Sequence, residues 1–266
     1  MSGPAQAPSA ATGARAFQAP VPLVTDLIAH NGRWLTNSSA LIDGAVELSW
    51  GQLDAATASV ACALTSLGIA RRERVAVLME NRFETLLAQL AILRAGAVAV
   101  PLNVSITDES VARMCADADC AAVIASSGHC GRIDTLRQSG ALRSRHFIAC
   151  EPTSSAWIDL QDLLSGPRCA APQVTIAPEG ECNIIYSSGT TAVPKGIVHT
   201  HACRMAWAYD AALALRYRAG CRTLCSLGLF SNITWVTMLA ISGSGSRRLR
   251  LSRVARSSPT SSSMTM

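Results

Sequence analysis

No stretch of this 266-residue sequence is apolar for long enough to span a membrane. The best candidate, residues 86–102, is interrupted by Gln89 and Arg94 and fits a helix, a turn and a strand better. A secretion signal is lacking too, because residues 1–21 have neither a basic start nor an apolar run. We therefore expect a cytoplasmic protein with no transmembrane segment and with a disordered arm over 1–21.

The ten cysteines lack the spacing of zinc or redox sites. Disulfide frameworks are typical of short secreted chains, and this chain is neither short nor marked for secretion. The expectation is buried free thiols in a reducing cytoplasm.

The excess of positive charge is confined to the end of the chain. Residues 241–266 hold five of the 23 basic residues and none of the 18 acidic ones, which leaves 18 of each sign in residues 1–240. A neutral globular part gives no indication of a nucleic-acid surface, so we expect no nucleic-acid partner.

From residue 22 onward, helical patterns alternate with short apolar strands. We expect strands at 40–43, 46–49, 74–79, 97–100, 121–125, 146–150 and 182–187, and helices at 22–30, 49–67, 81–95, 108–117 and 200–216. Ser49 with Gln52 forms a capping box for the second helix, and Asn81 with Glu84 is expected to cap the third. Continuously apolar strands between helices are typical of an α/β fold with stacked βαβ units and mainly parallel sheets.

The alternation breaks at a stretch that contains Pro167, Pro172 and Pro178, which suggests how the chain is divided. We expect a first α/β subdomain over 22–150, a connection over 151–180 and the start of a second α/β subdomain over 181–240. The second unit has too few strands for a complete sheet, so the predicted fold is truncated.

A loop of small and hydroxylated residues follows the strand that starts the second unit. It reads Ser187-Ser188-Gly189-Thr190-Thr191-Ala192-Val193-Pro194-Lys195-Gly196. Glycine lets backbone N–H groups approach phosphate oxygens, hydroxyls add donors and can reach Mg²⁺, and a lysine supplies a mobile charge. The loop therefore predicts a polyphosphate site at the end of a strand, where open α/β sheets bind ligands.

An ordinary polar surface loop would have a similar composition. However, the chain has 23 basic residues, and its only lysine, Lys195, lies in this loop. The spacing differs from that of P-loop NTPases, so another class of phosphate-binding protein is indicated.

The stretch from Tyr186 to Gly196 resembles the signature of the adenylate-forming superfamily, which includes acyl-CoA synthetases, peptide-synthetase adenylation domains and luciferases. Three earlier stretches resemble the family in the same order: 54–74, 79–84 (Met-Glu-Asn-Arg-Phe-Glu) and 94–103 (Arg-Ala-Gly-Ala-Val-Ala-Val-Pro-Leu-Asn). The resemblance covers about residues 22–240, and it implies the N-terminal part of a large adenylation domain.

The resemblance implies an ATP-dependent acid–thiol ligase that uses Mg²⁺. A carboxylate attacks the α-phosphate of ATP, giving an acyl adenylate and pyrophosphate, and the acyl group then passes to coenzyme A. The protein contributes positioning and charge neutralisation. The substrate would be an apolar carboxylic acid, as in fatty acid metabolism.

The resemblance also implies roles for individual residues. The residues expected to bind the nucleotide are Ser187, Ser188, Gly189, Thr190, Thr191, Lys195 and Gly196, and Thr191 is expected to contact the Mg²⁺ bound to ATP. The residues expected to line the substrate pocket are His201, Phe230, Ser231, Asn232 and Trp235. Two positions depart from the family pattern. Ala192 replaces a glycine, and Ser231 stands where histidine is common, which puts a contact to the substrate carboxylate in doubt.

After Ala240 the resemblance ends, and residues 241–266 form an aberrant Ser/Arg-rich tail without periodicity. We expect this tail to come from a shifted reading frame or a truncated gene. The family's adenine-binding, ribose-binding and C-terminal parts are not found, so we expect no adenylation by this chain alone. Two alternatives stay open: a non-catalytic interaction or regulatory protein, and a nucleic-acid or membrane binder acting through the tail.

Overall fold

The computed structural model describes residues 22–166, 171–172, 174–187, 194–218, 220–243 and 248–251. The helices are α1 (Val24–Trp34), α2 (Trp50–Ser66), α3 (Phe83–Arg94), α4 (Asp108–Asp117), α5 (Ser127–Gln138), α6 (Leu160–Ser165), α7 (His201–Ala214) and α8 (Asn232–Gly243). The strands are β1 (Ser39–Asp43), β2 (Val46–Ser49), β3 (Arg74–Leu78), β4 (Val98–Pro101), β5 (Cys120–Ser126), β6 (His146–Cys150), β7 (Ile158–Asp159), β8 (Glu181–Ser187), β9 (Lys195–Thr200), β10 (Arg222–Cys225) and β11 (Arg248–Leu251).

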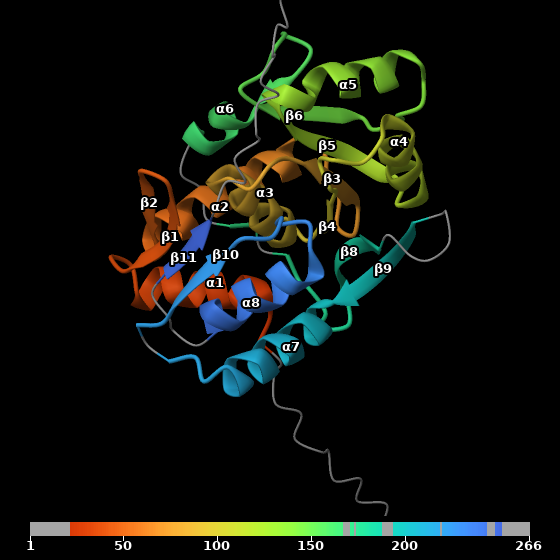
Figure 1. Ribbon diagram of the computed structural model, residues 1–266. Helices are drawn as coiled ribbons and strands as arrows, with labels where there is room; N and C mark the ends of the chain where they lie inside the picture. Colours follow the sequence, from red (N-terminus) through yellow and green to blue (C-terminus); the bar gives the residue numbers. More distant parts are fainter. Residues whose placement is uncertain are drawn as a thin grey trace, which may run out of the picture.

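Two sheets organise the chain (Figure 1). The larger has the order β7-β6-β5-β3-β4-β8-β9, and every neighbouring pair is parallel except β8 with β9. The smaller has the order β10-β11-β1-β2, and only β1 with β2 is antiparallel. The predicted α/β class with mainly parallel sheets is confirmed.

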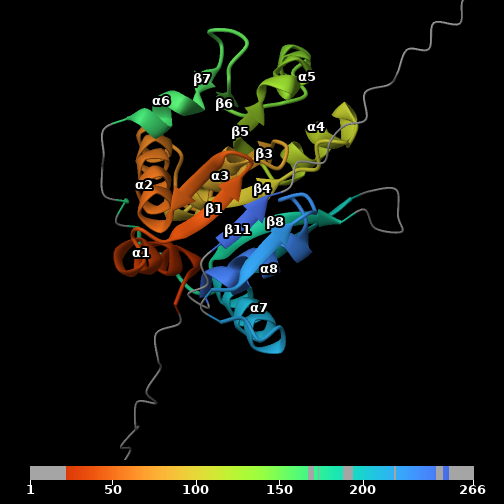
Figure 2. The ribbon, with the colours of Figure 1, turned by 60° about the vertical axis from the view of Figure 1, so that its left-hand side comes forward.

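Helix α3 is enclosed by the two sheets. All its residues from Glu84 to Arg94 are buried, and it contacts β1 of the smaller sheet as well as β3 and β4 of the larger one. A helix that is buried on all sides is stable only in such surroundings. The opposite face of the larger sheet is covered by α4 and α5, which form a second hydrophobic core with β5 (Figure 2).

The strands of the two expected subdomains share their sheets. β8 of the expected second unit pairs with β4 of the first, through Ala99 and Asn183, and β10 and β11 extend the sheet of β1. The connection over 151–180 therefore joins parts of the same two sheets, and the proposed subdomain boundaries stay a prediction.

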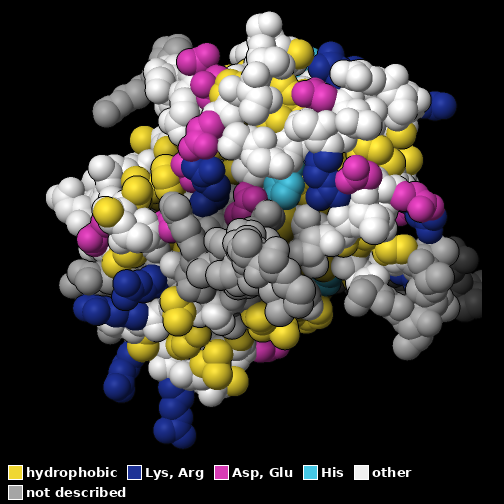
Figure 3. All heavy atoms as spheres, turned by 45° about the horizontal axis from the view of Figure 1, so that its top comes forward, with side chains coloured by type: hydrophobic (Ala, Val, Ile, Leu, Met, Phe, Trp, Pro, Cys, Tyr) yellow, Lys and Arg dark blue, Asp and Glu magenta, His cyan; other side chains and the backbone are white. Residues whose placement is uncertain are grey.

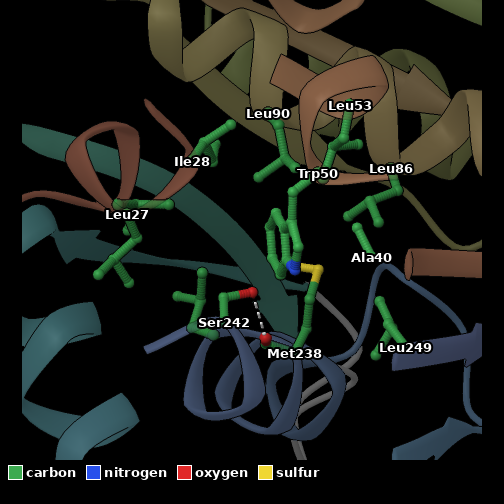
Figure 4. Close-up of a pocket in the computed structure, with 12 residues that line it drawn as sticks. Leu27, Ile28, Ala40, Trp50, Leu53, Leu86, Leu90, Met238, Ser242 and Leu249 are labelled. Carbon is green, nitrogen blue, oxygen red and sulfur yellow. Dashed lines mark hydrogen bonds between the residues drawn. The ribbon is translucent and has the colours of Figure 1, made fainter. Parts of the chain in front are cut away.

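Part of the expected aberrant tail belongs to the core. α8 runs past Ala240 to Gly243, and β11 lies between β10 and β1 with Leu249 and Leu251 buried. Figure 4 shows Leu249 beside Trp50 and Met238, around a small apolar cavity between α1, α2, α3 and α8. Arg and Leu alternate over 248–251, as in a strand, but four residues are too few to establish a period, so β11 was not expected from the sequence.

Two further expectations need correction. Cys62 is disulfide-bonded, whereas the other eight cysteines in the described residues form no disulfide, and six of them are buried as expected. Asn81 does not cap α3, because the helix begins at Phe83, after Arg82, and Asn81 binds elsewhere. The Ser49–Gln52 capping box is confirmed, with both of its hydrogen bonds formed.

Gly96 should tolerate substitution poorly. Its φ of +75° favours glycine, and an added Cβ would lie 2.6 Å from Cγ1 of Val174. Gly44 has a similar φ of +60° but open space around it, so it isolates the backbone effect. We expect Gly44→Ala to lower the free energy of unfolding by about 1–2 kcal/mol and Gly96→Ala by roughly 1–3 kcal/mol more. Urea unfolding of both variants measures the difference, and equal losses would contradict the close packing of Val174 on Gly96.

Candidate functional site

A cavity of about 890 Å³ lies at the carboxyl ends of the parallel strands. The segments after β3, β4 and β6 supply one side, and the segment before α8 supplies the other. Its walls are Met79, Glu80, Asn81, Arg82, Asn103, Val104, Ser105, Glu151, Ser226, Leu227, Gly228 and Phe230. Open α/β sheets bind ligands at this edge, and the volume suits a small organic molecule.

The charged groups of this cavity are paired with one another. Arg82 forms a bidentate ion pair with the buried carboxylate of Glu84, at 2.7 and 2.9 Å, and contacts Glu151 at 3.2 Å. The hydrogen bonds that Arg82 donates to Glu84 raise the pKa of Arg82, which therefore stays charged. Figure 3 shows basic and acidic side chains next to one another on one face of the molecule.

Glu80 connects the turn after β3 to the start of α5. His129 Nε2 lies 3.0 Å from Glu80 Oε1, and the Ser126 hydroxyl donates to the other carboxylate oxygen. The hydrogen bond from His129 holds the pKa of Glu80 at about 2, against the effect of partial burial. Glu80 is thus a fixed negative charge in the cavity wall.

The segment that carries Phe230 is held by Asn81. The Asn81 Nδ2–H group donates to the carbonyl of Leu227, and the N–H of Leu229 donates to Asn81 Oδ1, each at 2.8 Å. Phe230 itself packs its ring over Gly228, where an added Cβ would approach Phe230 Cε1 to 2.0 Å. Asn81, which looked like a helix cap in the sequence, instead positions the cavity wall.

The predicted phosphate loop is a β-hairpin connection. Ser187 ends β8 and Lys195 begins β9, and these two residues are paired across the hairpin. Lys195 is exposed, at the same carboxyl edge as the cavity. Ser188, Gly189, Thr190 and Thr191 lie outside the described residues, so the predicted phosphate and Mg²⁺ contacts of these residues stay predictions. Strand β9 was missed, although its pair Ile197-Val198 is a β-strand signal.

Gly196 is required by its neighbours. It is paired with Tyr186, and a Cβ at this position would lie 3.1 Å from Tyr186 Cζ and 3.0 Å from Ile184 Cγ2. Tyr186 Oη lies 2.6 Å from Asp117 Oδ2, which fixes the ring on β8. The role of Gly196 that the structure supports is close packing of the hairpin beside the loop.

A buried cation, Arg204 of α7, joins four elements. Its Nε and Nη2 donate to Asn183 Oδ1 at 3.1 and 2.9 Å, and Nη1 donates to Asn232 Oδ1 at 2.6 Å. Nη2 also lies 3.2 Å from His199 Nδ1, which must accept because guanidinium has only donors. We call these four residues the Arg204 network. Burial lowers the pKa of Arg204 to about 10, and no carboxylate in the described ranges pairs with it.

Of the predicted pocket residues, Asn232 belongs to this network and Trp235 packs against Arg204. Asn232 is half-buried at the start of α8, with its oxygen bound to Arg204. Trp235 is fully buried, donates from Nε1 to the Leu229 carbonyl at 3.0 Å, and lies 5.5 Å from the Arg204 guanidinium. Asn232 and Trp235 do not line the cavity, and neither do Ser231 and His201. Phe230 is therefore the one predicted pocket residue that lines it.

His201 lies at the opposite edge of the sheet. Strand β9 runs antiparallel to β8 and carries the chain from Lys195 to Thr200, about 16 Å away at the usual rise per residue. His201 therefore begins α7 beside the amino end of β8, where it lines a separate cavity of about 370 Å³. The structure brings Ser187 and Lys195 together and separates both from His201.

The described residues contain no group of three His, Cys, Asp or Glu side chains that could hold a metal ion. Within the same residues, no helix is long and apolar enough to cross a membrane.

Comparison with known proteins gives this geometry a context. The family described as "AMP-binding enzyme" matches residues 29–260, which is most of the chain. The chain belongs to the AMP-binding enzyme family. The match continues past Ala240, where we had expected the family pattern to end, so that expectation is wrong.

Similar AMP-binding enzymes differ in the acids that their names specify. The chain is 33% identical over 202 residues to the long-chain-fatty-acid–CoA ligase FadD13 of Mycobacterium tuberculosis, covering 73% of this chain and 38% of that protein. It is 28% identical over 169 residues to a 3-hydroxybenzoate–CoA ligase of Aromatoleum, covering 64% and 32%. An inhibitor-bound N-terminal domain of FACL13 from Mycobacterium tuberculosis superposes with a TM-score of 0.80 at 25% identity, covering 88% and 58%. The chain thus spans about a third to two fifths of the length of these two curated ligases.

The Arg204 network should contribute strongly to stability. We expect Arg204→Met to lower the free energy of unfolding by roughly 2–4 kcal/mol, because the oxygens of Asn183 and Asn232 lose charged donors. Arg222→Met, at an exposed arginine of β10, should cost less than about 0.5 kcal/mol. Urea unfolding measures both, and a loss for Arg204→Met no greater than that of the control would contradict the network's importance.

Two buried histidines should make the fold sensitive to acid. Burial lowers the pKa of both His199 and His201 to about 4, below the unfolded value of about 6.5. Between these values the unfolded chain binds more protons, so stability falls as the pH falls from 6.5 to 4. We expect a loss of about 1–2 kcal/mol per histidine between pH 7 and pH 5. His199→Gln and His201→Gln should each reduce this loss, and His30→Gln, at an exposed position, should not; a pH-independent unfolding free energy would contradict the account.

Proposed function

We propose that this chain is the phosphate-binding part of an AMP-binding enzyme that activates an apolar carboxylic acid with ATP and transfers the acyl group to coenzyme A, and that the chain alone does not complete the reaction. The observation that supports it most is the position of Lys195. The chain's only lysine begins β9 beside Ser187, at the carboxyl edge of the sheet, in a family-matched segment.

The residues at this edge fit a polyphosphate. Lys195 is exposed and carries a mobile positive charge, and Ser187 supplies a hydroxyl on the paired strand. We propose that Lys195 contacts the terminal phosphates and that Ser188, Gly189, Thr190 and Thr191 complete the loop, with Thr191 near the bound Mg²⁺. ATP supplies the leaving pyrophosphate that makes activation of the acid favourable.

The cavity at the same edge fits an apolar acid. Phe230 and Leu227 line one side and Met79 and Val104 add apolar surface, whereas Arg82 is neutralised by Glu84 and Glu151. We propose that the acyl body lies against Phe230 and that its carboxylate is oriented near Ser231 and the start of α8. Asn232 would contact the carboxylate there, because the positive charge of Arg204, which donates a hydrogen bond to the Asn232 side-chain oxygen, polarises the amide group. A fatty acid is the leading candidate, since the fatty-acid ligase is the more similar of the two named ligases.

Nucleotide binding tests the proposal. We expect the chain to bind Mg-ATP, and Lys195→Met to weaken this binding roughly tenfold or more, because a charged contact to phosphate is lost. Lys195→Arg should weaken it less, and Arg222→Met, which removes an exposed arginine from the smaller sheet, should leave it unchanged. Isothermal titration calorimetry gives the Mg-ATP affinities of the unaltered chain and of the three variants.

Acid-dependent ATP–pyrophosphate exchange, with fatty acids and 3-hydroxybenzoate compared, tests the expectation that this chain alone does not form an adenylate. Exchange with a fatty acid would contradict that expectation, and its reduction by Phe230→Ala would support the proposed pocket. Unchanged Mg-ATP affinity in Lys195→Met would refute the proposed role of the loop.

A further inference from the structure

A second cavity lies at the amino-terminal edge of the larger sheet, away from Lys195. It has a volume of about 370 Å³ and is formed by the turns before β3 and β4, the segment before β8 and the start of α7. Its lining is Arg71, Arg72, Gly96, Thr175, Ile176, Ala177, Glu179, Gly180, Glu181 and His201. A water molecule occupies about 30 Å³ of liquid, so this cavity is large enough for a small solute.

His201, which lines this cavity, carries a buried polar atom without a partner. Its side chain is 1% exposed, and Nδ1 has no hydrogen-bond partner, whereas its backbone N–H donates to the Gly180 carbonyl at 3.0 Å. A buried polar atom without a partner costs about 1–3 kcal/mol, which a ligand that hydrogen-bonds to the ring would recover. Burial also lowers the pKa of His201 to about 4, so the ring is neutral at pH 7 and has one donor and one acceptor.

Two arginines supply positive charge at the mouth of the cavity. Arg71 and Arg72 are exposed, and neither guanidinium has a hydrogen bond or ion pair to any described residue. Nearby Arg74 differs, because it pairs with Glu181 at 2.9 Å and so neutralises that carboxylate. Glu179 is the remaining acidic group of the lining, which leaves an excess of one positive charge.

The backbone of this site is held in place. Arg72 has a φ of +65°, and its N–H donates to the Gly96 carbonyl at 2.8 Å, which joins the two turns. Val174 packs on Gly96, so the segment before β8 is fixed against the same turn. Two guanidinium groups and an imidazole on a fixed frame match the oxygens of a small oxyanion.

From this arrangement we propose that the cavity between Arg71, Arg72 and His201 binds a phosphate-bearing small molecule, at a site separate from the nucleotide loop. The arginines contact the phosphate oxygens, and His201 hydrogen-bonds to the same group or to a neighbouring hydroxyl. The proposal does not depend on the proposed ligase function, because Lys195 and His201 lie at opposite edges of the sheet.

The test is a titration with inorganic phosphate, followed by NMR of the ring-labelled histidines. The chain has five histidines, and His201→Gln identifies the resonance of interest. The experiment uses the Lys195→Met chain as well, so that phosphate bound at the nucleotide loop is distinguished. We expect a saturable shift of the His201 ring in both chains, with a dissociation constant on the order of 1 mM or below, while His30 is unaffected.

Variants then assign the shift to the arginines. Arg71→Gln with Arg72→Gln should weaken phosphate binding at least tenfold, and Arg71→Lys with Arg72→Lys should retain part of it. The matched control is Arg143→Gln with Arg216→Gln, two exposed arginines elsewhere, which should not change it. The proposal would be overturned if phosphate caused no saturable shift of the His201 ring, or if substituting Arg71 and Arg72 did not change that shift. Ordered water would then be the expected content of the cavity.

Discussion

The buried charge of Arg204 is the interaction on which the second half of the structure depends. Its guanidinium is fully buried and receives no carboxylate in the described part of the chain, so amide and imidazole acceptors must stabilise it. Those acceptors come from β8, β9 and α8, and Arg204 itself comes from α7. One desolvated cation thereby fixes the hairpin that presents Lys195 relative to the helix that follows Phe230.

A second constraint is the antiparallel pairing of β9. Parallel strands end at one edge of the sheet, and the hairpin returns the chain to the other. Lys195 is left at the carboxyl edge, near the segments after β3, β4 and β6, while His201 is carried to the amino edge. Two cavities with different chemistry result, one with a paired Arg82 and an apolar wall and the other with unpaired arginines and an unpaired imidazole.

The sequence predicts the elements that depend on local pattern. β2, α4 and β6 have the expected bounds, and the Ser49–Gln52 capping box marks the start of α2, because capping chemistry and apolar runs are visible in short windows. The family could be predicted because its loop motif is contiguous.

The elements and contacts that depend on distant partners could not be predicted. Asn81 satisfies the local pattern of a cap, but its amide binds Leu227 and Leu229, which are far away in the sequence. β11 is a strand because β10 and β1 flank it, and its four residues carry too little pattern on their own. Trp235 looks like a pocket residue in the sequence, yet it packs against Arg204 inside the core.

The proposed contact between Lys195 and the phosphates of ATP can be measured directly because of the composition of the chain. Because Lys195 is the only lysine, isotope labelling of lysine gives a single side-chain resonance. We predict that Mg-ATP shifts this resonance saturably, with the same dissociation constant that calorimetry gives, and that adenosine does not. Calorimetric binding of Mg-ATP with an unmoved lysine resonance would contradict the account.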